Sequence, residues 1–440
     1  MQKIFRETVR VLAPFVLLLA SLIFLFAMMN FLGADLKPVF TIIVVTSPVW
    51  LPIALFHIAF EQWMWSVEDM FRYKQGRTTL RIKLPQEVFK SPEAMESVLS
   101  QVWNINSRDN LMQTYLDGKH PLVMSLELVS IGGEVRFYAS VTTAKVKNAF
   151  ESQLYAQYPG VEVIEEEIDY TAEVQWDPDK WDLISFHLNK KKEEYLPLKS
   201  YIDFGLDKLP KEEEKFDPMS PMLEYLNSAK PHERVWIQFL CTPHDAMGFK
   251  EGKLKPTTTW AEAGKKEIDK IMKRDASGTG PDDSENRPML TQPERDKITA
   301  IDRNISKYAY SVGIRAIYIT ENGKFDPNMI SPLLRSFSQY DILGRNAIGV
   351  RWRTDYNYMF FQDITGKRKL AAKQRELEYY KSRYYVKEEK LSGVDDEKVF
   401  SVEELATIWH LPGSTIVTPG VSRIESTRRE APTNLPTGNF

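Results

Sequence analysis

The sequence has only one cysteine, Cys241, and six histidines among its 440 residues. A single thiol excludes an intramolecular disulfide framework and a zinc site built from several thiolates. It also favours a reducing compartment for the larger part of the chain. The net charge of -3 shows no basic excess of the kind that dedicated nucleic-acid-binding proteins carry, so direct nucleic-acid binding is not expected.

Sequence motifs for catalysis are lacking as well. No Walker A pattern, G-x-x-x-x-G-K-[ST], is present, and neither H-E-x-x-H nor G-x-S-x-G occurs. The nearest approach to a metal site is the set Cys241, His244 and His232, for which a buried thiol beside loop histidines is the favoured interpretation. We therefore predict no enzyme activity, no cofactor and no metal site.

Long uncharged runs are confined to the first 60 residues. Residues 11–34 carry no charge, and their number exceeds the roughly 20 residues that cross a hydrocarbon core of about 30 Å. Residues 38–60 form a second uncharged run, and only three residues separate the two. This spacing predicts a transmembrane hairpin within residues 1–77, and a cleaved signal peptide is disfavoured because its apolar region would be shorter.

Basic residues precede the first run and follow the second, whereas the turn between them has only Lys37. By the positive-inside rule, both termini face the cytoplasm, which predicts a two-pass protein of the cytoplasmic membrane. Pro48 and Pro52 predict a kink in the second span. Aromatic and basic residues that follow this span are predicted to lie at the membrane interface: Trp63, Trp65, Arg72 and Lys74.

The soluble part is predicted to be α+β. From residue 78 to 170, strand-like and helix-like segments follow one another in the order β-α-β-β-α-β. Gly132 and Gly133 join the second and third strands as a tight hairpin, and Pro159 and Gly160 stop the second helix. This order is that of the ferredoxin-like fold, in which two helices cover one face of an antiparallel sheet.

Residues 171–233 are interpreted as a connector, because charge runs such as 190–194 are typical of solvated surface. A second α+β lobe is predicted over residues 234–400, with helices near 260–273, 297–310 and 328–340. The polar stretch 274–296 is predicted to be a mobile insertion in this lobe. Whether the second lobe duplicates the first is left open.

Residues 401–440 are predicted to form a short amphipathic helix and an extended tail. Ser401 and Glu404 have the spacing of a capping box, which begins a helix that ends at Leu411, Pro412 and Gly413. Packing of this helix on its own body is the favoured interpretation, and docking on a partner is the alternative. The candidate partner-docking residues are Leu405, Trp409, His410, Pro412 and Gly413.

Several segments resemble a family of membrane proteins from candidate-phyla bacteria, which in turn is similar to the N-terminal part of type IV secretion coupling proteins of conjugative DNA transfer. The segments are LPQEVFKSPEAME, SLELVSIGGEVRFY, ESQLYAQYPGVEVIE, DRNISKYAYSVGIRAIYI, EELATIWHLPG and REAPTNLP. In fused relatives a P-loop ATPase domain follows, near where this chain stops at Phe440. The resemblance therefore implies a separately encoded P-loop ATPase as partner.

Two functions are compatible with these sequence features. The favoured one is a non-catalytic membrane subunit that positions or recruits the ATPase of a type IV secretion-like or DNA-translocation machine. The alternative is a membrane-tethered binding or sensing protein unrelated to secretion. Membrane lipid is an expected partner under both functions. The sequence does not decide whether the protein also forms a homo-oligomer.

Overall fold

A computed structural model describes most of the chain after residue 36. The described residues are 37–85, 90–103, 110–207, 216–244, 260–272, 290–354, 363, 366–383, 397–413, 420, 421 and 423. They fall into two compact units, one made of the residues up to Phe71 together with Met112–Gly118, and the other of the remaining chain. We describe the two units separately.

The first unit contains one long apolar helix, α2 (Lys37–Gln75), and a short helix, α4 (Leu111–Tyr115). The part of α2 from Val44 to Gln75 is long and apolar enough to cross a membrane. The other predicted span, residues 11–34, lies outside the described residues. The structure therefore gives one membrane-length helix, and the second half of the hairpin stays a prediction.

Helix α2 runs without interruption through Pro48 and Pro52. Pro48 has no N–H for the carbonyl group of Val44, and the hydroxyl of Ser47 donates a hydrogen bond to that carbonyl oxygen over 2.7 Å. Thr46 makes the same kind of bond to the carbonyl oxygen of Ile42. The hydroxyls thus satisfy carbonyl groups near the first proline, and the predicted kink does not break the helix.

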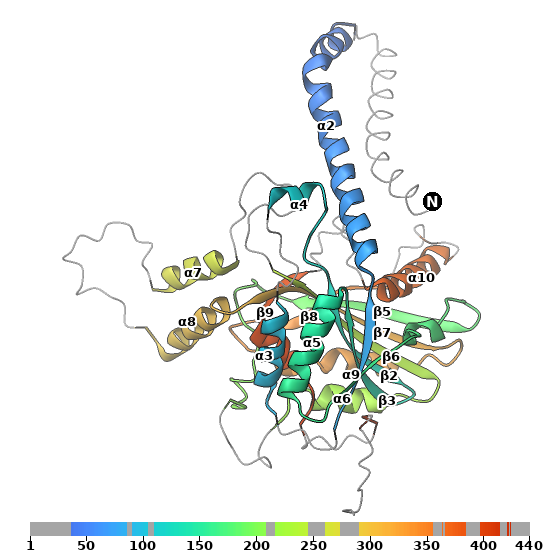
Figure 1. Cartoon of the computed structure of the whole chain (residues 1–440), viewed down its shortest axis with the longest axis vertical. Coiled ribbons are helices and arrows are strands. Elements are labelled where there is room, and N and C mark those ends of the chain that lie inside the picture. The colour runs from blue at the N-terminus through green and yellow to red at the C-terminus, as the bar shows by residue number, and fades with distance from the viewer. Residues whose placement is uncertain are drawn as a thin grey trace, which may run out of the picture. The chain divides into compact units, whose positions relative to one another are not determined.

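The second unit is built on one antiparallel sheet, shown in Figure 1. Among the described residues, the strand order is β4-β1-β3-β2-β6-β7-β5-β8, and β9 pairs with the first four residues of β7. The strands are β1 (Thr78–Lys83), β2 (Met124–Ile131), β3 (Glu134–Val141), β4 (Glu162–Glu165), β5 (Trp181–Lys190), β6 (Glu233–Pro243), β7 (Ala309–Glu321), β8 (Ile348–Arg353) and β9 (Lys398–Ser401).

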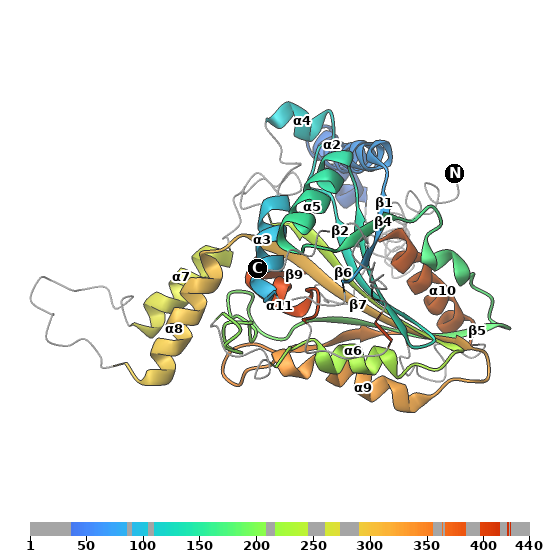
Figure 2. The same ribbon diagram turned by 60° about the horizontal axis from the view of Figure 1, so that its bottom comes forward.

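Helices cover both faces of this sheet (Figure 2). The larger core lies between the sheet and α3 (Pro92–Val102), α5 (Ala144–Gln157), α6 (Ser220–Asn227), α9 (Ile330–Arg335) and α11 (Val402–Ile408). A smaller core lies on the opposite face under α10 (Lys367–Ser382) and the 3-10 turn η1 (Tyr170–Glu173). Two further helices, α7 (Trp260–Ile271) and α8 (Gln292–Ile305), pack on each other.

The predicted elements between residues 78 and 165 are present. Gly132 and Gly133 have positive φ values of 60° and 92°, as a tight turn between β2 and β3 requires. Pro92 is at the start of α3, and Thr143 caps α5 by accepting a hydrogen bond from the backbone N–H of Val146. The fold is mixed helix and antiparallel sheet, as predicted.

The segment 171–233, expected to be a connector, contains strand β5 and helix α6. Strand β5 lies inside the sheet, between β7 and β8. The two predicted lobes share this one sheet because β2 pairs with β6. Its alternate residues Ser185 and His187 are buried polar groups, which resemble solvated positions in the sequence. Lys190, the first residue of a charge run expected to be solvated, is also completely buried.

The predicted insertion 274–296 and the helix 297–310 need correction at their boundary. Helix α8 begins at Gln292 because Glu294 accepts a hydrogen bond from the backbone N–H of Thr291 over 2.8 Å, and it ends at Ile305. Ala309 and Tyr310 belong to β7 instead. Residues 273–289 lie outside the described part.

The helix predicted over 328–340 is present as three short pieces. These are η5 (Pro327–Met329), α9, and η6 (Ser338–Tyr340), in chain order.

Candidate functional site

The predicted membrane-interface residues all lie in the last third of α2. Trp63 is exposed, with 52% of its surface accessible, and Arg72 and Lys74 are in the last turn of the helix. The indole N–H of Trp63 donates a hydrogen bond to the carbonyl oxygen of Tyr115 over 2.8 Å. Tyr115 belongs to the same compact unit, so α4 lies against the end of α2 where the sequence predicts the membrane boundary.

The predicted partner-docking residues are placed in the protein's own core. Leu405, Trp409, His410 and Pro412 are buried, and Gly413 is half-buried. Helix α11 packs on α3, and the indole ring of Trp409 lies 6.1 Å from the ring of Phe137 between centroids. Their side chains are therefore not an exposed surface, and α11 packs on its own body.

Helix α11 begins with the predicted capping box. The hydroxyl of Ser401 accepts a hydrogen bond from the backbone N–H of Glu404, and the carboxylate of Glu404 accepts one from the backbone N–H of Ser401. Glu404 also binds the ammonium group of Lys190 over 2.8 Å, in the protein interior. Burial lowers the pKa of Lys190, and the charge of Glu404 opposes this effect. The pair joins α11 to β5.

A second buried pair fixes the end of this segment. The ring of His410 has Nε2 at 3.2 Å from Asp217 and Nδ1 at 3.0 Å from the carbonyl oxygen of Ala406. Burial alone would raise the pKa of Asp217, but the charge and hydrogen bond of His410 and the backbone N–H groups of Met219 and Gly413 hold it below its ordinary value. The chain is thus held on the body as far as Gly413.

The chain is held again at Gly420–Arg423. The backbone N–H of Val135 donates to the carbonyl oxygen of Gly420 over 2.7 Å, and Val421 and Arg423 form parallel bridges with Val135 and Leu84. These contacts lie beside β1 and β3. The body therefore holds the chain at Gly420, Val421 and Arg423.

Sequence reasoning missed a row of polar side chains across the α10 face of the sheet. Its members are on four adjacent strands and are paired in register: Glu127 with Gln238, Gln238 with Arg315, and Arg315 with His187. All four are buried. Each of these residues stands between two apolar neighbours in its strand, but the strand register that brings them together cannot be inferred from a single sequence.

Helix α10 and the residue after it complete this row. The carboxylate of Glu376 lies 2.7 Å from Nε2 of His187, and the guanidinium of Arg383 donates to both carboxylate oxygens of Glu127 over 2.6 and 3.1 Å. Arg383 also binds Asp169 and has a positive φ of 49°. Burial opposes ionisation of Glu376, but His187 and then Arg315 hold its pKa below the ordinary value. The row joins α10 to the sheet by charge rather than by apolar packing alone.

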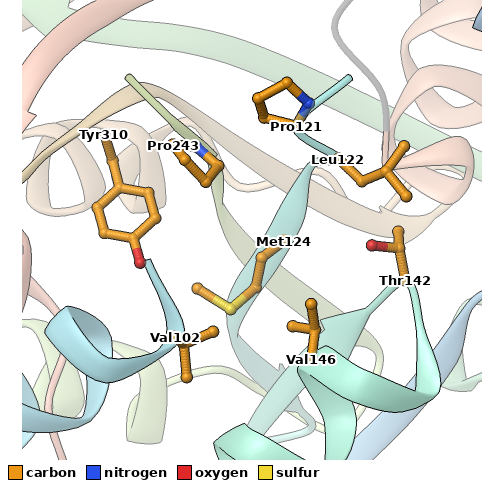
Figure 3. Close-up of a pocket in the computed structure, with 8 residues that line it drawn as sticks. All are labelled: Val102, Pro121, Leu122, Met124, Thr142, Val146, Pro243 and Tyr310. Atoms are coloured by element: carbon orange, nitrogen blue, oxygen red, sulfur yellow. The ribbon is translucent and has the colours of Figure 1, made fainter. Parts of the chain in front are cut away.

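Two cavities are described, and neither has the form of an enclosed ligand site. The first is about 20 Å³, room for one water molecule, and its lining is mainly apolar (Figure 3). The second is an open hollow of about 610 Å³ at the β4 edge, lined by charges of both signs, among them Arg77, Arg383 and Glu165. In the described part of the chain, no group of three or more His, Cys, Asp or Glu side chains could hold a metal ion.

Cys241, His244 and His232 do not form a site. Cys241 is buried on β6, where burial raises the pKa of its thiol. His244 lies 3.1 Å from the hydroxyl of Ser311 through Nδ1. The thiol is thus buried, as the favoured interpretation of Cys241 expects.

In the described part of the chain, these features define an α+β protein on a single antiparallel sheet, preceded by one helix of membrane length. Residues 66–424 match the family described as domain of unknown function DUF8128, and the chain belongs to that family. Neither the curated proteins nor the solved structures include a significant match.

Proposed function

We propose that the protein is a non-catalytic membrane subunit that positions or recruits a separately encoded P-loop ATPase of a type IV secretion-like or DNA-translocation machine. The membrane part of this proposal rests on one observation about helix α2. None of the residues in its apolar stretch is buried. A long apolar helix that its own protein leaves uncovered is suited to lipid. The secretion part is supported by the resemblance of segments from Leu84 to Pro436.

The proposed topology is a two-pass hairpin with both termini in the cytoplasm. It is supported by the uncharged run 11–34, the short turn after it and the basic residues on both sides. A reporter that is active only inside the cell, fused after Phe440, should be active, and alkaline extraction should leave the protein in the membrane. Activity of an external reporter at the same position would refute this topology.

We also propose that the sheet consists of two ferredoxin-like halves. Strands β1 to β4, with α3 and α5, have the spatial order β4-β1-β3-β2. Strands β5 to β8, with α6 and α9 in the corresponding connections, have the order β8-β5-β7-β6. The same order in both halves, joined by antiparallel pairing of β2 with β6, supports an internal repeat.

The partner contact is proposed to lie after Arg423 rather than on α11. The side chains of Leu405 and Trp409 are buried in the body, whereas the segment 429–436 is one of those that carry the resemblance. Gly420 and Arg423, which precede this segment in the chain, are bonded to the body beside β1 and β3. The body would then act as a rigid support that presents a short recognition segment near β1 and β3.

Affinity purification from native membranes in mild detergent tests this proposal. A truncation after Phe400 would remove buried residues and unfold the body, so the comparison uses the full chain, a truncation after Ile424 and a chain with residues 425–440 scrambled. We expect a Walker A ATPase with the full chain and its loss with both altered chains, while their thermal unfolding midpoints stay unchanged.

Two outcomes would count against the proposal. If an ATPase is retained by both altered chains, the recognition segment lies elsewhere and the tail contact is refuted. If no ATPase copurifies with the full chain, the scaffold function itself is refuted, and the alternative of a membrane-tethered binding or sensing protein replaces it.

A further inference from the structure

The short helix α4 and the residues after it are fixed against one face of α2. Tyr115 is in ring contact with Phe60, with 5.8 Å between centroids, and accepts the hydrogen bond of the Trp63 indole. Gly118 has a φ of +64°, and a side-chain carbon at this position would overlap the backbone carbonyl group of Val67. Positions 60, 63 and 67 share a helix face, so α4 has a defined height along α2.

Two large apolar side chains, one in α4 and one directly after it, are exposed. Met112 and Leu116 are four residues apart, which places them on the same side of a helical turn. Their surfaces are 65% and 54% exposed, although both are large apolar side chains. Helix α2 belongs to the same compact unit and also exposes large apolar side chains, among them Phe56 at 71% and Trp63 at 52%.

The height of α4 matches the place where α2 would leave the hydrocarbon. The uncharged run of α2 ends at Phe60, and Glu61 is its first acidic residue. From Phe60 to Val67 a helix rises by about 10 Å. The headgroup layer on each side of a bilayer is about 5 to 8 Å thick, so the two distances are comparable. Trp63 and Trp65, side chains typical of this layer, lie at the same height.

We propose that residues 111–118 form a second, interfacial contact with the lipid bilayer, in which Met112 and Leu116 enter the boundary between headgroups and acyl chains. Short amphipathic helices bind there through one apolar side. This inference rests on the proposed insertion of α2 in the membrane. A contact at two points would restrict the tilt and rotation of α2, which a single helix leaves free.

Site-specific fluorescence quenching in vesicles tests this contact. The full chain is reconstituted in phosphatidylcholine–phosphatidylglycerol vesicles after a nitrobenzoxadiazole label is attached to Leu116→Cys or Met112→Cys. The native Cys241 is buried with a raised pKa, so it reacts poorly, and unsubstituted protein measures any background. Leu343→Cys, at a fully exposed leucine of the soluble body, is the matched control, and Phe56→Cys reports on α2 itself.

If the inference holds, lipids with a doxyl group near the headgroup quench the label at position 116 at least about twofold more than they quench the label at 343. Aqueous iodide should show the opposite order. The label at position 56 should be quenched best by doxyl groups deep in the acyl chains.

Three results would overturn the inference, and they are distinguishable. If position 116 behaves as position 343 does while position 56 is quenched by lipid, α4 does not contact the bilayer and the membrane anchor stands. If position 56 is also unquenched by lipid, the proposed anchoring of α2 fails. If position 116 is shielded from both quenchers, protein covers this surface, and crosslinking between copies identifies a second chain as the cover.

Discussion

Arg383 supplies positive charge to the buried carboxylate of Glu127, at one end of the row under α10. It binds Glu127 through two nitrogen atoms and Asp169 through a third, in the protein interior. We expect Arg383→Met to lower the free energy of unfolding by about 3 to 5 kcal/mol, because Glu127 would keep its burial and lose its compensating charge. Denaturant unfolding of the full chain in detergent, followed by tryptophan fluorescence, measures this loss.

The control for this prediction is the double variant Glu127→Leu, Arg383→Met. It removes the uncompensated carboxylate together with the guanidinium, so it should be more stable than Arg383→Met alone. The exposed pair of Lys324 and Glu321 gives a second comparison, since Lys324→Met should change stability by less than about 1 kcal/mol. A double variant as unstable as the single one would show that the charge pair is not the cause.

Asp217 makes the stability of the body depend on pH at the acid end. Its pKa in the folded protein is below the ordinary value, which is about 3.9 in an unfolded chain. Its contribution is therefore fully present above about pH 5 and is lost as the pH falls through the folded pKa. In Asp217→Asn, the difference in unfolding free energy from the native protein should be constant between about pH 5 and 6 and shrink below about pH 4.

Urea unfolding of both proteins over this pH range measures the difference. The sign distinguishes the cause, because a carboxyl with a raised folded pKa would stabilise the protein more as the pH fell. A difference that widened below pH 4 would contradict the assignment of His410 as the group that holds Asp217 ionised.

At the scale of elements, α11 is held by burial more than by its cap. Leu405→Ala should lower the unfolding free energy by about 2 to 5 kcal/mol, as a buried leucine in a packed core does. Ser401→Ala removes one capping hydrogen bond and should lower it by about 0.5 to 2 kcal/mol. Leu370→Ala, at an exposed position of α10, should have an effect within about 0.5 kcal/mol.

Thermal and denaturant unfolding of the three variants rank these effects. If Leu405→Ala proved as mild as Leu370→Ala, α11 would not be part of the core in solution. The partner-docking interpretation of α11 would then have to be reconsidered, because a helix that leaves the body exposes Leu405 and Trp409.

Elements that are defined by local signals could be predicted from the sequence, and those defined by tertiary contacts could not. The glycine pair at 132–133 and the capping box at Ser401 follow from backbone conformation and short-range hydrogen bonds, and both are present as predicted. Strand β5 was missed because Ser185 and His187 are buried by partners far away in the sequence.

The candidate sites divide in the same way. The position of Trp63, at the end of an uncharged run, indicates a membrane boundary without knowledge of the fold. Burial of Lys190 depends on Glu404, which is more than 200 positions away in the sequence. No local sequence pattern indicates such a pair. The row from Glu127 to His187 depends on strand register, which a single sequence leaves open.

At the scale of the whole sheet, the two halves share both a seam and a core. Strands β2 and β6 pair over eight residues, from Met124 with Cys241 to Ile131 with Arg234. The larger core contains buried residues of both halves in one cluster, among them Phe137 on β3 and Leu333 on α9. Neither half can therefore unfold without exposing apolar surface of the other.

This arrangement predicts one cooperative unfolding step for the soluble body, in spite of its two similar halves. Hydrogen exchange of the full chain in rising denaturant, read by mass spectrometry, follows peptides of β1–β4 and of β5–β8 separately. Both sets should lose protection at the same denaturant concentration. Phe137→Ala in one half and Leu333→Ala in the other, each costing about 2 to 5 kcal/mol, should shift both sets together, because the cluster that they destabilise is common to both. Separate transitions, with each variant shifting only its own half, would show that the seam between β2 and β6 does not couple the halves.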